Sequence, residues 1–356
     1  MSSWTITTMR VTTLALLLVV SPAAAQKPLP VIDMHLHASV ADANGPPPLA
    51  LCVPVQEHAV HDPRKPWPAT FMEWQKNPPC SDPVWSPGTD EELMQETIAA
   101  LGRRNVIGVL SGTAGRVQKW KKAAPDRFIS GLQFQFGRDD VSPDSLRRLH
   151  EEGRLAVFAE VTNQYVGIAP DDPRFEPYLA VAEQLDIPVG IHVGTGPPGA
   201  PYLGFDRYRA ALHSPLTLEN ALIRHPRLRV YIMHAGWPML DDLLAVLWAH
   251  PQVYVDVAGI VFGVPRAEFY RYLQRIVEAG FGKRVMFGSD QMVWPGLIER
   301  SIESIESAPF LNTAQKRDIL YNNAARFLRL SEAEIARHHD AQRNSIAPDL
   351  PVRRKR

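Results

Sequence analysis

A regular alternation of short apolar runs with amphipathic stretches, from Pro30 to about Leu330, constrains the fold most strongly. Each apolar run is rich in Val, Ile, Leu or Phe and is bounded by Gly, Pro or charged residues, as buried parallel strands are. The pattern predicts eight strands: Leu29–His35, Asn105–Gly112, Phe128–Phe136, Leu155–Val161, Pro188–Gly194, Arg229–Ala235, Val253–Ala258 and Arg284–Asp290.

The stretches between these runs predict helices. Asp90–Arg103 follows a capping threonine and has acidic residues in its first turn, and Ser142–Glu152 has proline in its first turn. Eight such units in about 300 residues favour an α/β fold of the (β/α)8, or TIM-barrel, type over an open sheet, which more often has five or six strands. The other predicted helices are Ala114–Lys122, Phe175–Leu185, Leu216–Arg224, Met239–Ala249, Arg266–Ala279 and Gly296–Ser307.

Residues 1–25 have the pattern of a secretory signal peptide. A polar stretch ends at Arg10, the apolar run Val11–Val20 follows, and Ala23–Ala25 supplies the small residues of a cleavage site. The run is far shorter than the roughly 20 residues that span a bilayer, so we expect no stable membrane insertion. The alternative is an apolar first strand or helix. We expect cleavage near Ala25, export to the periplasm or beyond, a barrel over 26–345 and a basic tail over 346–356.

Composition narrows the class of protein further. Lysine plus arginine number 38, and aspartate plus glutamate also number 38. This balance argues against a nucleic-acid binder, which usually carries a basic excess. The hydrophobic fraction of 45% and the charged fraction of 21% allow a sizeable core. We expect a small-molecule substrate.

The segment 38–89, directly after the first strand, is a proline-rich insertion. Eleven of the 32 prolines lie between Pro46 and Pro87, so we expect a loop rather than packed helix or strand. Loops of this length are rare in compact domains unless they are functional. The segment also holds Trp67, Phe71, Trp74 and Trp85. We therefore expect a rigid lid over the barrel mouth, with Trp67 and Trp74 contacting substrate; the alternative is a surface arm that contacts a second copy in a homodimer, and both roles can coexist.

The two cysteines, Cys52 and Cys80, both lie in this insertion. In an oxidising compartment such a pair is a plausible disulfide. Two unrelated buried thiols are the alternative. Their spacing does not suit a clustered zinc site.

The first strand carries the sharpest chemical signal, because it ends with His35 and His37. Residues at i and i+2 of a strand point the same way, with Cα atoms roughly 6.5–7 Å apart. Two imidazoles in this arrangement can hold one cation. The pair therefore predicts a metal site at the carboxyl end of the barrel, where the active sites of such barrels lie.

His192, His234 and Asp290 end later predicted strands at a depth that matches the first-strand histidines, and Glu160 lies near the end of the fourth predicted strand. A buried glutamate needs a partner, and either a metal or an arginine would serve for Glu160. Convergence of histidines and carboxylates at one rim suits a mononuclear or dinuclear hydrolytic metal site. Asp256 could line the same site. Histidines 213, 225, 250, 338 and 339 are expected to be structural or solvated, and His58 and His61 to lie on the surface.

These residues resemble the amidohydrolase superfamily: Asp-Met-His-Leu-His at 33–37, the His192 and His234 strand ends, Gly-Ser-Asp at 288–290, and Tyr-Asn-Asn-Ala-Ala-Arg-Phe at 321–327. The resemblance covers about Pro30 to Leu330. It is strongest to the branch with aminocarboxymuconate semialdehyde decarboxylase, resorcylate-type decarboxylases and small-ring lactonases.

The resemblance implies that His35, His37, His192 and Asp290 bind a divalent metal, expected to be zinc. It also implies that His234 is an acid/base or carbonyl-polarising residue. Glu160 stands where dinuclear members of the superfamily carry a carboxylated lysine. The sequence therefore allows either one or two bound ions.

The expected reaction is hydrolysis of a small ester, lactone or amide by a metal-activated water. Asp290 would accept the proton of the water and deliver it to the leaving group, and Trp237 would contact the substrate. A non-oxidative decarboxylase of an aromatic or unsaturated carboxylate is the first alternative. A catalytically inactive metal- or ligand-binding barrel is the second.

Overall fold

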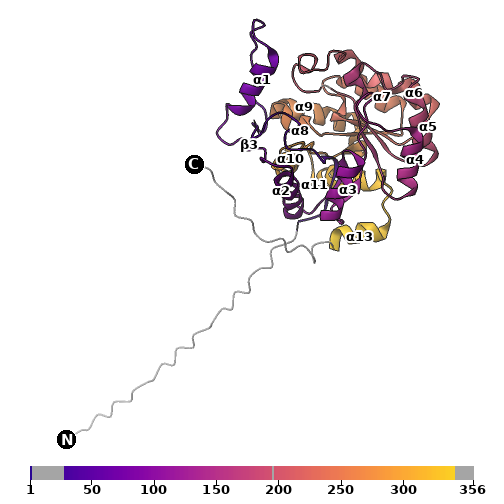
Figure 1. Ribbon diagram of the computed structural model, residues 1–356. Coiled ribbons are helices and arrows are strands. Elements are labelled where there is room, and N and C mark those ends of the chain that lie inside the picture. Colours follow the sequence, from indigo (N-terminus) through magenta and orange to yellow (C-terminus); the bar gives the residue numbers. More distant parts are fainter. Residues whose placement is uncertain (2–27, 195, 341–356) are drawn as a thin grey trace.

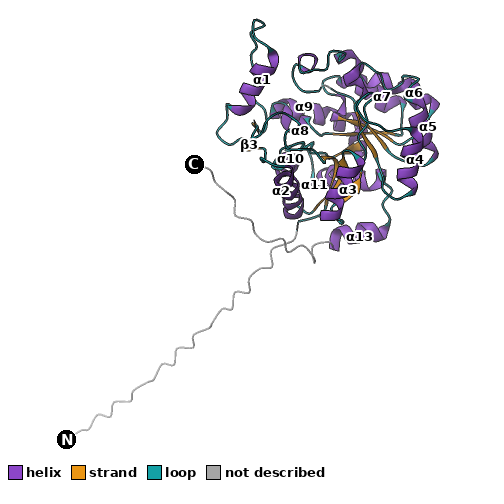
Figure 2. Cartoon of the chain, in the orientation of Figure 1, coloured by secondary structure: helices purple, strands orange, loops and turns teal. Residues whose placement is uncertain are grey.

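The structure, a computed structural model, describes residues 28–194 and 196–340 together with Met1 (Figure 1). The predicted signal peptide, apart from Met1, and the predicted basic tail lie outside the described residues. Parallel strands form the centre of the molecule, and helices surround them (Figure 2). The strands of the barrel are β1 (Val31–His37), β4 (Val106–Ser111), β5 (Phe128–Ser130), β6 (Phe158–Val161), β7 (Val189–His192), β8 (Val230–Met233), β9 (Val253–Asp256) and β10 (Val285–Met286).

Hydrogen bonds close these strands into a barrel. One parallel sheet has the order β1-β4-β5 and the other β10-β9-β8-β7-β6. Parallel bridges from Gly131 to Val157 and from Phe134 to Val161 join β5 to β6. At the other seam, the Met34 amide donates to the Phe287 carbonyl at 2.9 Å, next to β10. The predicted TIM barrel is therefore confirmed, and the ends of all eight strands face one rim.

The helices that follow the strands lie where the sequence predicts them. Thr89 caps the first of them by accepting a hydrogen bond from the Glu92 amide, and Ser142 caps another in the same way through Ser145. These helices are α2 (Asp90–Arg103), α3 (Ala114–Ala123), α4 (Pro143–Glu151), α5 (Glu176–Gln184), α6 (Glu219–Arg224), α7 (Leu240–Ala249), α9 (Arg266–Ile276) and α10 (Leu297–Glu306).

Several strand bounds differ from the prediction. The first strand is shifted, so that it includes both His35 and His37. The third is a regular strand only over Phe128–Ser130, and beyond it only the isolated bridges at Gly131 and Phe134 remain of the predicted strand to Phe136. The chain leaves the regular ladder near the rim, and apolar composition alone does not show where pairing stops. Additional helices complete the chain: α8 (Ile260–Gly263), α11 (Thr313–Arg317), α12 (Asn323–Phe327) and α13 (Glu332–Asp340).

The expectation that the insertion lacks helix and strand was wrong. It contains the antiparallel pair β2 (Ala50–Leu51) and β3 (Val84–Trp85) and the helix α1 (Trp67–Lys76). Pro66 directly precedes α1, and Pro68 lies in its first turn, where a missing amide costs nothing. Counting prolines without their positions therefore misjudged this segment.

The insertion is bonded to the loops that follow three barrel strands. Cys52 and Cys80 are joined by a disulfide within it. All three loops leave the carboxyl ends of their strands, so the insertion lies on that side of the barrel. The contacts are Trp67 Nε1 to the Pro198 carbonyl (2.9 Å), the Val55 amide to the Phe262 carbonyl (2.9 Å) and Trp294 Nε1 to the Leu49 carbonyl (3.0 Å).

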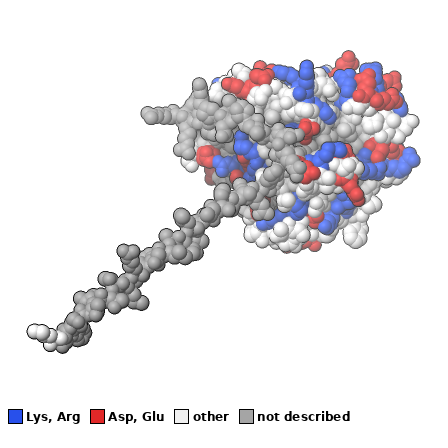
Figure 3. All heavy atoms as spheres, turned by 90° about the horizontal axis from the view of Figure 1, so that it is seen from below, with Lys and Arg blue, Asp and Glu red and all other residues white. Residues whose placement is uncertain are grey.

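Surface charge follows the composition. Over the face drawn in Figure 3, basic and acidic side chains are interspersed rather than gathered by sign. Within the described ranges, no helix is long and apolar enough to cross a membrane.

We expect the Cys52→Ser/Cys80→Ser double variant to fold with a lower free energy of unfolding. The disulfide closes a loop with a sequence separation of 28. In the chain-entropy model a loop of this size contributes about 3–4 kcal/mol. Urea unfolding of the native protein and the variant measures the difference. Equal stability, or two titratable thiols in the native protein, would contradict the prediction.

Candidate active site

The polar residues at the strand ends converge on one point. His35 and His37 come from β1, Glu160 from β6 and His192 from β7, while His234 directly follows β8. Asp290 follows β10 and completes the group. His37 is partly buried and the other five are buried. All six residues predicted as ligands or catalytic groups therefore meet at the carboxyl rim of the barrel.

Glu160 lies between two pairs of histidines. Its Oε2 is 3.7 Å from His35 Nε2 and 3.6 Å from His37 Nε2. Its Oε1 is 2.5 Å from His192 Nδ1 and 3.8 Å from His234 Nε2. The two carboxylate oxygens thus face different histidine pairs.

The β1 histidines present unpaired nitrogens to this centre. His35 Nε2 and His37 Nε2 are buried and have no aligned hydrogen bond, although Asp290 Oδ1 lies 3.7 and 3.0 Å from them. Buried polar atoms are rarely left without a partner. Groups of these donors lie within 4.8 Å of one another, a separation that allows them to share an ion.

Outer hydrogen bonds orient two of the histidines. His35 Nδ1 lies 3.2 Å from Asp256 Oδ2, and His234 Nδ1 lies 2.9 Å from the Ala258 carbonyl. A carbonyl only accepts, so His234 donates from Nδ1 and its Nε2 faces the centre unprotonated when the ring is neutral. Metal-ligating histidines are commonly held through their second nitrogen in this manner.

The backbone is strained at two site residues. His234 has φ 61° and Asp290 has φ 50°, in the left-handed region that few non-glycine residues adopt. Gly259 packs so closely that a Cβ there would lie 2.8 Å from His234 Nδ1 and 3.2 Å from Asp290 Oδ2. Strain of this kind clusters at functional positions, which agrees with the placement of these two side chains.

The rings of Tyr165, Tyr208 and His213 form a group next to His192. The hydroxyl of Tyr165, in the 3-10 turn η1 (Asn163–Val166), is 3.3 Å from His192 Nε2. The His213 ring is fully buried, 5.5 Å from the His192 ring and 4.4 Å from that of Tyr208. Burial lowers the pKa of His213 to about 3, so it is a neutral packing residue and not a solvated one.

The electrostatics of the centre favour a cation. Burial opposes ionisation of Glu160, but its contacts with His192, His234 and His35 hold its pKa well below the usual value. Burial likewise opposes ionisation of Asp290, and attraction to His35 and His37 still lowers its pKa. The centre therefore combines two carboxylates with four imidazoles.

Sequence reasoning missed some supporting residues. Tyr165 and Gln164 hold His192 through its ring and carbonyl, and neither belongs to a strand end. Asp33 is fully buried, and burial raises its pKa to about 7. Asp33 lies two residues before His35 on the same strand, and this spacing was the sequence signal that could have identified it as a supporting residue. Asp256, considered as a possible lining residue, instead supports His35.

The aromatic residues predicted to form the substrate pocket differ in how far they are buried. Trp67 is buried against the loop after β7, and Trp74 is partly buried on α1. Trp85 is 47% exposed and does not form part of a buried wall. Trp237 is partly buried, and its Nε1 donates to Glu268 at 3.2 Å. His58 and His61 lie against Trp74 and Trp67 respectively.

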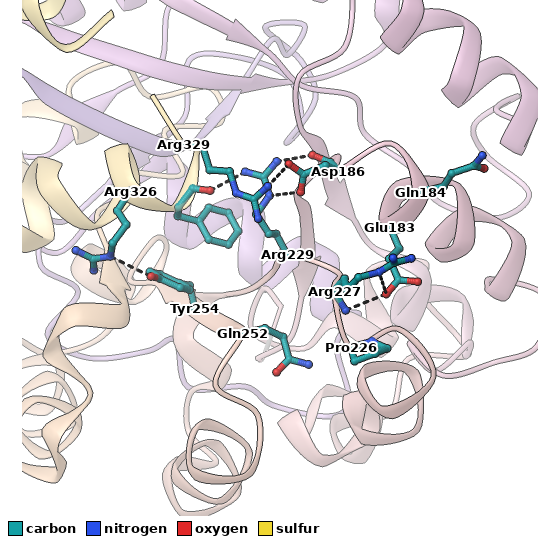
Figure 4. A pocket seen from close by; sticks show the side chains of 11 residues that line it. Glu183, Gln184, Asp186, Pro226, Arg227, Arg229, Gln252, Tyr254, Arg326 and Arg329 are labelled. Atoms are coloured by element: carbon teal, nitrogen blue, oxygen red, sulfur yellow. Dashed lines mark hydrogen bonds and ion pairs between the residues drawn. The ribbon is translucent and has the colours of Figure 1, made fainter. Parts of the chain in front are cut away.

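A hollow with four arginines lies at the other end of the barrel (Figure 4). Arg229 and Arg329 both pair with Asp186, and the backbone amide of Arg227 donates to Glu183 at 2.9 Å. Several of these residues precede strands, at the rim that serves stability in such barrels. We interpret this hollow as a structural ion-pair network.

A family model described as amidohydrolase matches residues 32–330. The chain belongs to the amidohydrolase family. This bears out the resemblance noted in the sequence, and the family together with the clustered ligands supports a metal-binding enzyme. No curated protein matches the chain.

Solved structures similar to this amidohydrolase share its fold. An uncharacterised TIM-barrel protein from Bordetella bronchiseptica has TM-score 0.55 at 20% identity, over 87% of this chain and 100% of that one. A probable 2-pyrone-4,6-dicarboxylic acid hydrolase from Acinetobacter baumannii has TM-score 0.52 at 17% identity, over 84% and 99%. The 5-carboxyvanillate decarboxylase from Sphingomonas paucimobilis has TM-score 0.51 at 16% identity, over 85% and 100%.

We expect Tyr165→Phe to weaken metal binding by about 10–100-fold without unfolding the protein, because it removes the hydroxyl that fixes the His192 ring. Competition with a chromogenic chelator measures the affinity. Tyr178→Phe is the matched control, since the Tyr178 hydroxyl donates to the Val141 carbonyl, away from the converging site residues. Equal metal affinity in the two variants would show that Tyr165 does not orient the ligand.

Proposed function

We propose that this amidohydrolase is an exported, metal-dependent hydrolase of small neutral esters, lactones or amides. The observation that carries the proposal is the pair of buried, unpaired Nε2 atoms of His35 and His37, which face Glu160 and Asp290. Such atoms are costly to bury without a ligand. A divalent cation satisfies both at once.

The donor set suits zinc. Zinc in proteins is usually bound by imidazole nitrogens, carboxylate oxygens and thiolates, and the first two kinds are present here. We assign His35, His37 and Asp290 to the ion, with Glu160 and His192 adjoining. When bound there, the ion supplies a Lewis acid that acidifies a water molecule and polarises a carbonyl oxygen.

Asp290 is the proposed proton carrier. Its Oδ1 lies 3.0 Å from His37 Nε2, so the carboxylate is held within the ligand cluster. We propose that Asp290 accepts the proton of the attacking water and later donates it to the leaving group. The tight packing of Gly259 against its Oδ2 limits the carboxylate to one orientation.

The substrate class follows from the charges around the centre. None of the recorded ion pairs or hydrogen bonds of the six converging side chains involves lysine or arginine, among the residues that the structure describes. An anionic substrate would meet Glu160 and Asp290, neither of which is paired with a lysine or arginine. This favours neutral acyl substrates over the dicarboxylic acid and carboxyvanillate named for two structural neighbours.

The insertion is the proposed lid. Its bonds to the loops after β7, β9 and β10 span the rim that carries the site. Trp67 is fixed by its hydrogen bond to Pro198, six residues beyond His192. We propose that Trp67, with Phe71 and Trp74 stacked along α1, borders the substrate entrance. The disulfide supports export, since such bonds persist in oxidising compartments.

The deciding experiment is a substrate screen on metal-loaded protein with neutral esters, lactones and amides beside aromatic carboxylates. We expect hydrolysis of a neutral substrate, loss of turnover with a chelator and recovery with zinc. Carbon dioxide release from a carboxylate instead would support the decarboxylase. Metal binding without turnover of any class would support an inactive barrel.

We expect Asp290→Asn to lower kcat by roughly 10²–10⁴, the usual contribution of a general acid/base. The amide keeps the size of the side chain but cannot carry the proton. Steady-state assays at saturating metal and substrate measure kcat of the variant and of the native protein. Asp126→Asn, at an exposed position, should retain full activity. An active Asp290→Asn enzyme would exclude Asp290 as the proton carrier.

We expect Trp67→Ala to raise KM roughly 3–10-fold, as for a loss of about 1 kcal/mol of binding energy, with a smaller effect on kcat. Steady-state kinetics on the preferred substrate give both constants. Trp248→Ala is the control, because Trp248 is 84% exposed on α7. An unchanged KM in the Trp67 variant would contradict the lid.

A further inference from the structure

We propose that the hollow at the amino rim, in addition to its structural ion pairs, binds the phosphate group of a small phosphate monoester. Arg227, Arg329 and Gln252 contact the phosphate oxygens, and Tyr254 contacts the organic group of the ester. The inference concerns a second site and does not depend on the proposed hydrolysis.

The hollow has room for such a ligand and lies away from the converging histidines. Its volume is about 810 Å³. Small-molecule sites in proteins commonly have volumes of about 300–1,000 Å³. Arg229 directly precedes β8, and His234 directly follows it. At the rise of an extended strand these two residues are roughly 16 Å apart, so a ligand in the hollow does not reach the carboxyl-rim cluster.

Positive charge exceeds negative charge in the lining of the hollow. Four arginines line it, but only two carboxylates do, Glu183 and Asp186. Both carboxylates are already shared. Asp186 pairs with both Arg229 and Arg329. Glu183 Oε2 also lies 3.2 Å from His225 Nδ1. A cleft lined by an excess of one charge raises the local concentration of ions of the opposite charge.

Two of the arginines keep donors for a ligand. Arg229 does not, because its Nε donates to Asp186 at 2.9 Å and its Nη1 to the Phe327 carbonyl at 2.7 Å. Arg329 is exposed and donates to Asp186 through Nη1 alone. The Arg227 guanidinium is also exposed and has no hydrogen bond to any described residue. Guanidinium groups with free donors match phosphate oxygens in charge and in geometry.

Arg229 and Arg329 repel each other across the carboxylate that they share. Burial lowers the pKa of Arg229, and the charge of Arg329 lowers it further, although Asp186 opposes both effects. One carboxylate does not compensate two guanidinium groups. A dianion beside them supplies the missing negative charge.

Tyr254 gives the hollow a flat aromatic side, opposite Arg227 in Figure 4. Its hydroxyl accepts a hydrogen bond from Arg326 Nε at 3.2 Å, and its ring lies 4.9 Å from the ring of Phe327. The Tyr254 ring is therefore held in place, where it can pack against a flat organic group.

The donors of the hollow favour phosphate over carboxylate. The Gln252 amide lines the hollow and has no side-chain partner within the described ranges. Together with Arg227 and Arg329 it offers donors from three side chains. A phosphate monoester presents three acceptor oxygens and close to two negative charges near neutral pH, whereas a carboxylate presents two oxygens and one charge.

The first test compares three ligands by calorimetric titration of the metal-loaded protein at constant ionic strength. We expect phenyl phosphate to bind more tightly than inorganic phosphate, which lacks the ring, and than benzoate, which lacks the second charge. Equal affinity for phenyl phosphate and inorganic phosphate would overturn the assignment to an ester. Equal affinity for phenyl phosphate and benzoate would overturn the assignment to phosphate.

The second test removes the free guanidinium groups. We expect Arg227→Gln/Arg329→Gln to weaken phenyl phosphate binding about 10–100-fold, because charge-assisted hydrogen bonds are lost. Arg154→Gln/Arg174→Gln is the matched control, since it removes the same charge from two arginines that lie outside the hollow. An equal loss of affinity in the control would show nonspecific attraction and overturn the inference.

Hydrogen–deuterium exchange locates the bound ligand. We expect phenyl phosphate to slow exchange over 227–229, 252–254 and 326–329. Protection confined to 234–237 would place the phosphate at the carboxyl rim and overturn the inference. Circular dichroism establishes that each variant is folded. If the double variant is not, Arg227→Gln alone should still weaken binding, and unchanged affinity in that folded variant would count against the site.

Discussion

The burial of Glu160 among four histidines is the constraint on which the rest of the site depends. A carboxylate in such a position is tolerated only with close partners, and His192 at 2.5 Å is the nearest of them. The histidines in turn need their outer nitrogens fixed, which Asp256, Ala258 and Tyr165 do. Asp256 and Ala258 come from the end of β9 and the loop that follows it, and Tyr165 comes from the turn after β6. The site is therefore rigid because the barrel brings those ends together at one rim.

Much of this arrangement could be predicted because it is local in the sequence. Period-two spacing placed His35 and His37 on one side of a strand, and the end of each apolar run placed His192 and Asp290 at the same rim. Support from outside the strands could not be predicted in this way. Tyr165 lies in a 3-10 turn, and its contact with His192 depends on how the chain turns after β6. Helix α1 was hidden by prolines whose positions suit a helix start.

The insertion links the lid to the ligands through backbone geometry. Gly199 has φ 72°, and a Cβ there would lie 2.1 Å from Trp67 Nε1. Glycine at this position therefore allows α1 to dock on the loop that begins at His192. Movement of the insertion would act on this loop, and the disulfide restricts such movement from within. The segment that begins at the predicted ligand His192 thus also holds the Pro198 carbonyl that fixes Trp67.

The two rims of the barrel use charge in opposite ways. At the amino rim Arg229 and Arg329 both form ion pairs with Asp186 (Figure 4). At the carboxyl rim the acids face His35 and His37, whose Nε2 atoms have no hydrogen-bond partner among the described residues. The apolar core and the amino-rim pairs contribute to the stability of the fold without involving any residue of the carboxyl-rim cluster. At the other rim, the recorded ion-pair partners of Glu160 and Asp290 within the described residues are all histidines, and two carboxylates among neutral imidazoles would attract the cation of the proposed function.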